Sequence, residues 1–205
     1  MGFPSCELDI RRVAVLGSPG SGKTAFAHRL AAATGLPLFH LDDFYWHPGW
    51  TRTPGDLWQD TVIRLCAGDR WIIDGNYLAT VGVRVQAADL VVLFDRHPLL
   101  CAVSLIRRSV RLRLRRDTNE YLPRRLRSCG VDSPVRSLRA LLRKALVFRR
   151  RQLAIMRRLM QVHKSLVITC RSRAAADRLL ASLEGLIQAP ATDISGRCNC
   201  PGQPT

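Results

Sequence analysis

Five short apolar runs are separated by longer segments in which apolar residues recur every three or four positions. Runs of the first kind are typical of buried parallel strands, and segments of the second kind are typical of helices that cover a sheet. Because strands and helices alternate, we expect an α/β domain whose parallel sheet carries helices on both faces. The expected strands are residues 12–16, 36–41, 70–73, 89–94 and 166–169. The expected helices are residues 23–34, 53–67, 98–116, 133–162 and 172–186.

The composition along the chain predicts the domain organisation. The 205 residues suffice for one domain of ordinary size, which we place at residues 1–187. An arginine-rich helical section, residues 96–163, lies between the fourth and fifth strands, and residues 188–205 are expected to be a disordered tail. The chain shows no secretory signal and no apolar run long enough for a bilayer, so we expect a cytoplasmic protein with no membrane partner.

The segment after the first strand matches the pattern GxxxxGK[ST] and opens a helix, which is the context that a phosphate-binding P-loop requires. Its glycines let backbone N–H groups converge on phosphate oxygens, and the helix N-terminus adds a favourable partial charge. Lys23 can reach the β- and γ-phosphates of ATP, and the Thr24 hydroxyl can bind Mg²⁺. The expected nucleotide-binding residues are Gly17, Ser18, Pro19, Gly20, Ser21, Gly22, Lys23 and Thr24.

This loop, GSPGSGKT, resembles that of adenylate kinase and its relatives, and three further segments narrow the resemblance. The segments are LFHLD running into WHPGW, then WIIDGNY, and then ADLVVLFD. Together they resemble the bacterial family labelled DNA topology modulation protein, a group of adenylate-kinase-like P-loop proteins, over residues 11–185. The resemblance implies a P-loop NTPase fold with a five-stranded parallel sheet of nucleotide-kinase type, ATP binding and phosphoryl transfer.

Acidic residues at the ends of the expected strands are the candidates for metal and substrate binding, because ligands of such sheets bind at the carboxyl ends of the strands. The resemblance implies that Asp74 takes the position at which a carboxylate holds Mg²⁺, although Asp-Gly is also a common turn pair. Asp42 could orient or deprotonate an acceptor hydroxyl, or bind Mg²⁺. Asp43 and Asp95 are interpreted as helix caps.

Two tryptophans, Trp46 and Trp50, flank a Pro-Gly turn between the second strand and the next helix. Their rings could stack on a flat acceptor such as a base, or could form a hydrophobic lid packed on the core. The resemblance to adenylate kinase implies that this region is the acceptor arm, and its short length suits an acceptor smaller than a nucleotide. We expect Asn76, Tyr77 and Arg84 to line the acceptor site as well.

The net charge of +16 is concentrated in residues 96–158, which hold 19 Lys and Arg against 3 Asp and Glu. Such a block indicates a polyanionic partner, either nucleotide phosphates or nucleic acid, and a solvated helical face is the alternative. Arg111 and Arg115 share one expected helical face ahead of residues 117–132, which have a lid-like composition. We therefore expect these two arginines to stabilise the transferring phosphoryl group.

The favoured interpretation is an ATP- and Mg²⁺-dependent kinase that moves the γ-phosphate to a nucleotide, nucleoside or small hydroxylated acceptor. Lys23, Asp42, Arg111 and Arg115 would be its catalytic residues, and Thr24 and Asp74 would hold the metal. The alternative is an ATP-binding regulator of DNA topology that engages DNA through residues 96–158, although no recognised DNA-reading motif accompanies the block. A kinase acting on RNA ends or nucleosides would use both the P-loop and the basic block.

Overall fold

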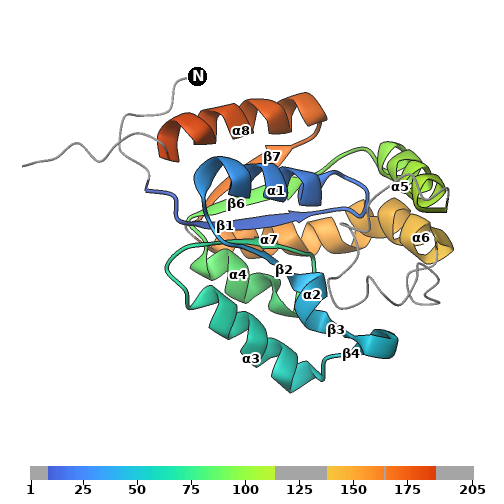
Figure 1. The fold of residues 1–205 in the computed structure, drawn as a ribbon, viewed down its shortest axis with the longest axis horizontal. Coiled ribbons are helices and arrows are strands. Elements are labelled where there is room, and N and C mark those ends of the chain that lie inside the picture. The colour runs from blue at the N-terminus through green and yellow to red at the C-terminus, as the bar shows by residue number, and fades with distance from the viewer. Residues whose placement is uncertain (1–8, 114–137, 164, 188–205) are drawn as a thin grey trace, which may run out of the picture.

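The computed structural model describes residues 9–113, 138–163 and 165–187. Its centre is a five-stranded sheet in which every strand pair is parallel, as the sequence predicts. The strand order is β2-β5-β1-β6-β7, so the strand that precedes the phosphate loop lies in the middle (Figure 1). The strands are β1 (Arg12–Gly17), β2 (Leu38–His40), β5 (Trp71–Asp74), β6 (Leu90–Phe94) and β7 (Leu166–Cys170).

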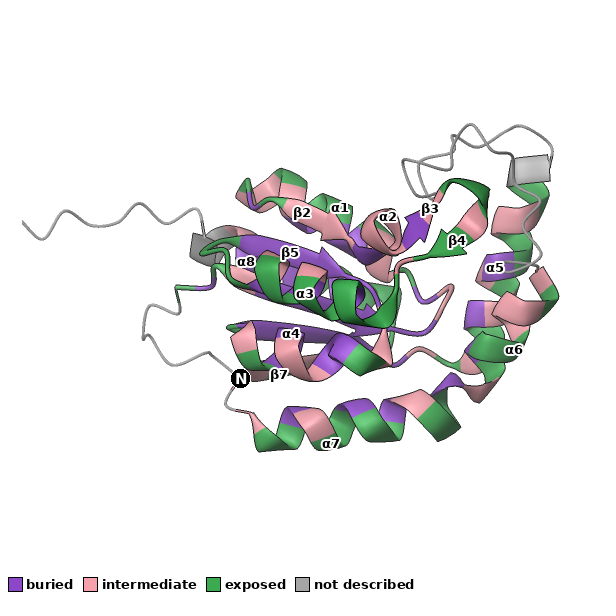
Figure 2. Cartoon of the chain, turned by 90° about the horizontal axis from the view of Figure 1, so that it is seen from below, coloured by how far each residue is buried: buried purple, intermediate pink, exposed green. Residues whose placement is uncertain are grey.

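Helices cover both faces of this sheet, and the buried residues run through the strands between the two helical layers (Figure 2). Alternate side chains of β1 enter the two cores, with Val13 and Val15 on one face and Ala14 and Leu16 on the other. Burial on both faces explains why these strands are continuous apolar runs. The first face carries α1 (Lys23–Thr34) and α8 (Arg173–Ile187), and the second carries α3 (Gly55–Cys66), α4 (Val81–Ala87) and α7 (Ala154–Val162).

The arginine-rich section begins with α5 (Pro98–Arg113), which packs against α6 (Leu138–Phe148) beyond the carboxyl edge of the sheet (Figure 1). The expected helix 133–162 is divided, because the π-helical segment Arg149–Leu153 separates α6 from α7. The lid-like residues 117–132 and the expected tail 188–205 lie outside the described residues.

The segment after β2 differs from the prediction. The strand ends at His40 and a short helix, α2 (Leu41–Tyr45), follows at once, so Asp42 lies in a first helical turn and not at a strand end. A small antiparallel hairpin comes next, in which β3 (Trp46–His47) pairs with β4 (Thr51–Arg52) across the 3-10 turn Pro48–Trp50.

The helix expected over residues 53–67 is shorter in the structure, and Thr53 lies outside it. The helix begins at Gly55, and the Thr53 hydroxyl donates to the carbonyl oxygens of Phe44 at 2.8 Å and Tyr45 at 3.1 Å. Thr53 therefore closes the base of the small hairpin. Among the described helices, none combines the length and apolar character that crossing a bilayer requires.

Candidate active site

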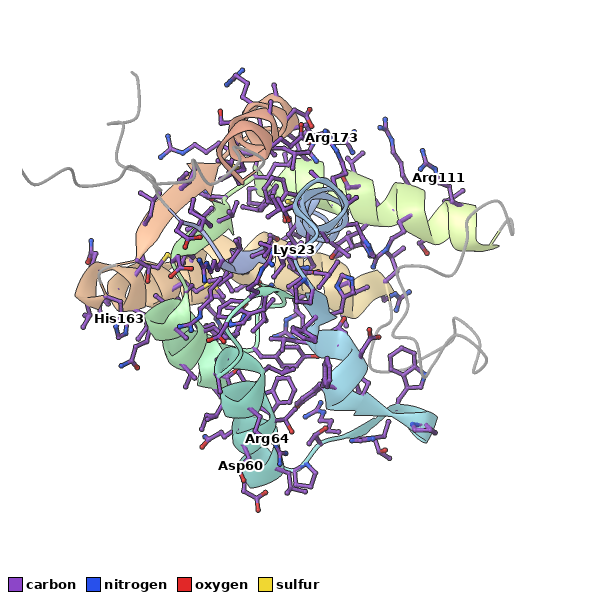
Figure 3. All side chains as sticks on the ribbon, turned by 60° about the vertical axis from the view of Figure 1, so that its left-hand side comes forward. Lys23, Asp60, Arg64, Arg111, His163 and Arg173 are labelled. Atoms are coloured by element: carbon purple, nitrogen blue, oxygen red, sulfur yellow. The ribbon has the colours of Figure 1, made fainter. Side chains whose placement is uncertain are left out.

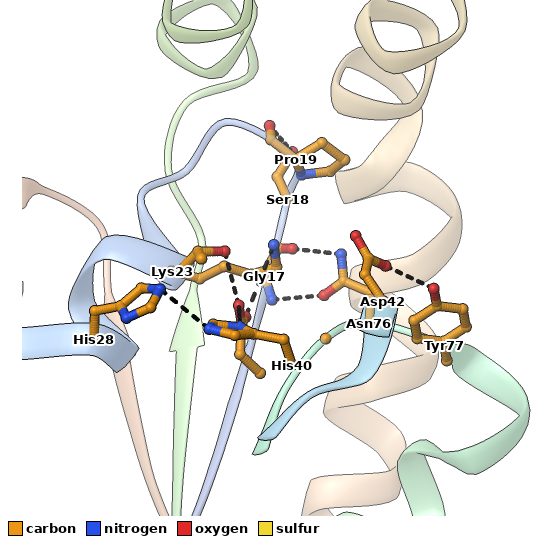
Figure 4. Close-up of polar contacts among 12 residues, drawn as sticks. Gly17, Ser18, Pro19, Lys23, His28, His40, Asp42, Asn76 and Tyr77 are labelled. Atoms are coloured by element: carbon orange, nitrogen blue, oxygen red, sulfur yellow. Dashed lines mark hydrogen bonds and ion pairs between the residues drawn. The ribbon is translucent and has the colours of Figure 1, made fainter. Parts of the chain in front are cut away.

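The phosphate loop joins β1 to α1 and is anchored by Asn76 (Figure 4). The Gly17 backbone N–H donates to Asn76 Oδ1 at 2.9 Å, and Asn76 Nδ2 donates to the Gly17 carbonyl oxygen at 2.5 Å. One side-chain amide thus satisfies both backbone groups of Gly17, as a neighbouring strand would. Asn76, which we expected on the acceptor side, therefore fixes the point at which the loop leaves the sheet.

The tip of the loop lies against the first turns of α5. A Cβ atom on Gly20 would collide with the carbonyl oxygen of Cys101 and would lie 2.9 Å from Leu105 Cγ. Gly20 also has a φ of +79°, which residues with a side chain rarely adopt. Glycine is therefore required here by the backbone angle and by the available space, and α5 supports the loop from outside.

Asp74 lies at the end of β5, beside the phosphate-loop strand, and only 5% of its surface is exposed. Thr24 Oγ1 donates to Asp74 Oδ2 at 2.7 Å, and Lys23 Nζ lies 3.9 Å from Asp74 Oδ1. Burial raises the pKa of the Asp74 carboxyl, but Lys23, His40 and Thr24 outweigh it and hold that pKa below its ordinary value. The carboxylate is therefore ionised at neutral pH, which metal binding requires.

Two histidines lie next to Asp74: His40 at the end of β2 contacts the Asp74 carboxylate, and His28 on α1 contacts His40 (Figure 4). His40 Nδ1 lies 3.2 Å from Asp74 Oδ2, and His40 Nε2 lies 3.1 Å from Nε2 of the exposed His28. A partner at this distance orients the Asp74 carboxylate in the way that outer-shell groups orient metal ligands.

The buried oxygens at this site fit Mg²⁺ and phosphate. Within the described residues, Ser21 Oγ and Asp74 Oδ1 are buried and make no hydrogen bond. Mg²⁺ prefers oxygen ligands, and Thr24 and Asp74 present a hydroxyl and a carboxylate side by side. Buried polar atoms of this kind need partners, which a nucleotide and its metal would supply.

Asp42 and Tyr77 come together although they belong to different segments. The Tyr77 hydroxyl donates to Asp42 Oδ1 at 2.6 Å (Figure 4). The Tyr77 ring is packed in turn, with its centroid 4.5 Å from that of Tyr45 and 4.8 Å from that of Trp58. Because the ring is held on two sides, Tyr77 is a rigid donor that orients one oxygen of the Asp42 carboxylate.

The two tryptophans of the hairpin have different surroundings. Trp46 is buried, and its ring lies 5.1 Å from Tyr45 and 5.7 Å from Trp50, between centroids. Trp50 is partly exposed at the hairpin turn, where its φ of +58° is unusual for a bulky residue. Packing against the core, one of the two alternatives, therefore describes Trp46, whereas Trp50 is the more exposed of the two rings.

Arg84, which we expected to line the acceptor site, is completely buried beneath the loop after β5. Its guanidinium donates to the carbonyl oxygens of Gly75 at 2.5 Å, Asn76 at 3.0 Å and Tyr77 at 3.0 Å, and its Nε donates to that of Thr80 at 3.3 Å. Burial lowers the pKa of Arg84 to about 10, so it stays charged at neutral pH. Arg84 therefore fixes the backbone that carries Asn76 and Tyr77, and does not line the acceptor site.

Asp95, which the sequence suggested as a helix cap, anchors the arginine-rich section to the sheet. Its side chain is fully buried, with Oδ1 2.9 Å from Arg149 Nε and Oδ2 2.9 Å from Arg157 Nη2. Asp95 follows Phe94, which pairs with Gly17 at the start of the phosphate loop. The ion pairs therefore bring two guanidinium groups to the strand beside that loop.

Of the two arginines that we expected to be catalytic, Arg111 and Arg115, the structure describes only Arg111. Arg111 is exposed on the outer part of α5 and is directed away from Lys23 (Figure 3). Arg115 lies outside the described residues. The structure therefore does not bring Arg111 to the phosphate loop, whereas Arg149 is held near that loop by Asp95.

Several site residues had little sequence signal. Arg149 and Arg157 resemble their many arginine neighbours, and only the fold shows which of them meet Asp95. His28 and His40 belong to separate elements, and their proximity depends on α1 lying next to β2. The one feature of the sequence that could have placed His40 in the site is its position at a strand end, two residues before Asp42.

Replacing Asn76 with Ala should weaken nucleotide binding, because the Gly17 backbone loses both of its side-chain partners. We expect a loss of about 1–3 kcal/mol of unfolding free energy and a smaller Mg²⁺·ATP-induced rise in melting temperature. Thermal unfolding with and without nucleotide measures both effects. Gln59→Ala, on the exposed side of α3, is the control; equal behaviour of the two variants would contradict the anchoring role.

Comparison with known proteins supports the fold assignment. No family model matches the chain, and no curated protein matches its sequence. Among solved structures, shikimate kinase from Acinetobacter baumannii in complex with shikimate matches 87% of this chain and 93% of its own, with a TM-score of 0.53 and 16% identity.

Two further solved structures are more distant. A sugar kinase from Janibacter matches 85% of this chain and 95% of its own, with a TM-score of 0.47 and 21% identity. Shikimate kinase from Bacteroides thetaiotaomicron matches 87% of this chain and 98% of its own, with a TM-score of 0.46 and 14% identity. The resemblance to DNA topology modulation proteins is not supported by these comparisons. The match to the shikimate kinase from Acinetobacter baumannii, together with the sheet order, shows that this chain has the P-loop kinase fold.

Proposed function

We propose that this protein is an ATP-dependent phosphotransferase that acts on a hydroxyl-bearing acceptor. The observation that carries the proposal is the contact of Thr24 with Asp74, with Lys23 Nζ 3.9 Å from the same carboxylate. A complete phosphate loop next to a buried, ionised carboxylate at the end of a neighbouring strand is the arrangement that P-loop phosphoryl transfer uses. The shikimate kinase match shows that this fold can hold a small hydroxylated ligand.

Each residue has a separate task in the proposed reaction. The loop N–H groups and the Lys23 ammonium bind the β- and γ-phosphates and stabilise the charge that develops during transfer. Thr24 and Asp74 would hold Mg²⁺, which when bound neutralises phosphate charge. Asp42, oriented by Tyr77, accepts the proton of the acceptor hydroxyl as its oxygen bonds to phosphorus and ADP leaves.

The DNA-binding alternative receives no specific support from the described residues. Two arginines of the basic block, Arg149 and Arg157, are already paired with the buried Asp95. The positive charge of these two side chains therefore neutralises a buried carboxylate. The proposed acceptor does not include nucleic acid.

Substitution of the two site carboxylates should separate their tasks. Asp74→Asn should raise the Mg²⁺ concentration needed for half-maximal activity, because a charged ligand is lost. Asp42→Asn should lower turnover by about 100-fold or more with little effect on ATP binding, since it removes the proton acceptor. Steady-state kinetics against Mg²⁺ and ATP distinguish the effects. The proposed division is wrong if both variants change only the Mg²⁺ dependence.

An ADP-release screen tests the proposed function itself. Purified protein is incubated with Mg²⁺·ATP and nucleosides, nucleoside monophosphates, sugars and other hydroxylated metabolites, and ADP production is followed by a coupled assay. We expect acceptor-dependent ADP release that is lost in Lys23→Ala. Release that ignores the acceptor would indicate an ATPase and would contradict the proposal.

A further inference from the structure

Asp95 is fixed directly beside the start of the phosphate loop. It follows Phe94, which pairs with Gly17, and a Cβ atom on Gly17 would lie only 2.5 Å from Phe94 Cβ, so the two strands are in close contact here. On its other side, the Asp95 backbone N–H donates to the Cys170 carbonyl oxygen at 3.1 Å. The backbone that carries the Asp95 carboxylate is therefore held between β1 and β7.

The side chain of Cys101 lies within electrostatic reach of both Asp95 and Lys23. Burial raises the pKa of the Cys101 thiol and a hydrogen bond with Ser18 lowers it, while Asp95 and Lys23 act on it with opposite signs. Cys101 belongs to the turn of α5 that lies against Gly20 of the phosphate loop. Asp95 is therefore part of the same cluster of side chains as the lysine that we assign to the phosphates.

Arg149 contacts Asp95 with one edge of its guanidinium. Its Nε lies 2.9 Å from Asp95 Oδ1, and its Nη2 donates to Asp95 Oδ2 at 3.3 Å. Because the guanidinium is a planar fork of three nitrogens, this arrangement turns Nη1 away from the carboxylate. The Arg149 side chain is 45% exposed, whereas that of Asp95 is fully buried. The ion pair is therefore buried on the side of the carboxylate and open on the side of the arginine.

The π-helical segment that begins at Arg149 brings Arg149 and Arg157 to the same carboxylate. The two residues are eight positions apart, which in a regular α-helix places them about 80° apart around the axis. A π turn takes up one extra residue, so the two arginines share a face as residues seven apart would. Such turns are rare and occur frequently at functional sites. The segment is therefore an independent indication that the position of Arg149 matters.

The cluster of Asp95, Arg149 and Arg157 contains one carboxylate and two guanidiniums, so these three side chains together leave one positive charge. Arg157 lies on α7, which covers one face of the sheet. Arg149 lies where α6 meets the π-helical segment, and α6 lies beyond the carboxyl edge (Figure 1). Ligands of such sheets bind at this edge. Of the two arginines, Arg149 is therefore the one on the side of the ligand.

From this placement we infer that Arg149 contacts the γ-phosphate of ATP during transfer, and that Asp95 is a positioning residue that holds Arg149 beside the phosphate loop. The inference rests on the proposed function and assigns to Arg149 the role that we expected of Arg111 and Arg115. As the acceptor oxygen bonds to phosphorus, the bond from phosphorus to the ADP oxygen breaks and the acceptor proton passes to Asp42. Arg149 keeps its protons and donates hydrogen bonds to the phosphate oxygens, where negative charge develops.

The binding of two nucleotides tests this inference without an acceptor. AMP-PNP, an ATP analogue that resists hydrolysis, and ADP are each titrated with Mg²⁺ into wild-type protein, Arg149→Gln and Arg150→Gln by calorimetry. We expect Arg149→Gln to bind AMP-PNP at least about 10-fold more weakly and to lose less affinity for ADP, because a charge-assisted contact with the γ-phosphate is removed. Arg150→Gln, at the next exposed position of the same segment, should bind both as the wild type does.

Three results of this titration would overturn the inference. An unchanged affinity of Arg149→Gln for AMP-PNP would show that Arg149 does not reach the phosphates. An equal loss for AMP-PNP and ADP would show that the γ-phosphate is not its partner. An equal loss in Arg150→Gln would show that net charge, and not the position of Arg149, is responsible.

Turnover separates a direct contact from a structural effect. With the best acceptor of the ADP-release screen at saturation, kcat should fall about 100-fold or more in Arg149→Gln. Arg157→Gln also loses one ion pair with Asp95, so it should lower the melting temperature to a similar extent while kcat stays near that of the wild type. Similar losses of kcat in both variants would show that the ion pairs only stabilise the fold, which contradicts the inference.

A double-variant cycle tests the positioning role of Asp95. Asp95→Asn should lower kcat, and the variant that combines it with Arg149→Gln should lose no more than Arg149→Gln alone, because Asp95 acts through Arg149. Additive losses overturn this role. The proposed function fails separately, through a wild-type protein whose ADP release ignores the acceptor, and in that case the comparison of AMP-PNP with ADP still decides whether Arg149 contacts the γ-phosphate.

Discussion

Lys23→Ala should lower phosphoryl transfer by about 100-fold or more, because the ammonium is the group placed to stabilise charge on the transferring phosphate. The Lys23 side chain is 18% exposed and its Nζ lies 3.9 Å from Asp74, so its loss removes a charge contact without opening the core. The fold should therefore persist. Turnover under saturating acceptor measures the effect, with circular dichroism as the check on folding.

Lys144→Ala is the matched control for this variant. Lys144 is exposed on α6, and its loss removes the same charge from the molecule without touching the phosphate loop. Equal loss of turnover in both variants would show that net charge, and not the position of Lys23, is responsible. Wild-type turnover in Lys23→Ala would contradict the assigned role directly.

Arg84→Met should lower the unfolding free energy by about 3–5 kcal/mol, because the carbonyl oxygens of Gly75, Asn76, Tyr77 and Thr80 lose the guanidinium as a donor together. Methionine occupies the space without supplying N–H groups. Denaturant unfolding measures the loss, and Arg64→Met, at an exposed position of α3, provides the comparison. A loss below about 1 kcal/mol would contradict the support that Arg84 gives to residues 75–80.

Most of the sheet could be predicted from the sequence, because strands buried on both faces are unbroken apolar runs. The phosphate loop could be placed for a similar reason: its residue types are required locally, by the backbone angle at Gly20 and by the N–H groups that meet phosphate. The position of Asp74 near the phosphate loop could be predicted from the strand pattern, because Asp74 ends β5 and β5 lies beside β1 in the sheet.

The residues that sequence reasoning misplaced depend on contacts between distant segments. Arg84 was expected to line the acceptor site because it follows the third strand. A charged residue is rarely buried unless it is paired, and the backbone carbonyls that pair with Arg84 could not be read from the sequence. The pairing of Asp95 with Arg149 and Arg157 joins residues more than fifty positions apart. Helix α4 was not among the expected helices, because its seven residues are too few to show the apolar period of a helix.

The most direct test of the central claim is ³¹P NMR of the protein with Mg²⁺·ATP and the best acceptor from the screen. The account predicts that the γ-phosphate signal disappears as a phosphate-ester signal grows in equal amount, and that Lys23→Ala shows neither change. Conversion of ATP to ADP and inorganic phosphate alone, at equal rates in both proteins, would contradict the claim that this site transfers a phosphoryl group.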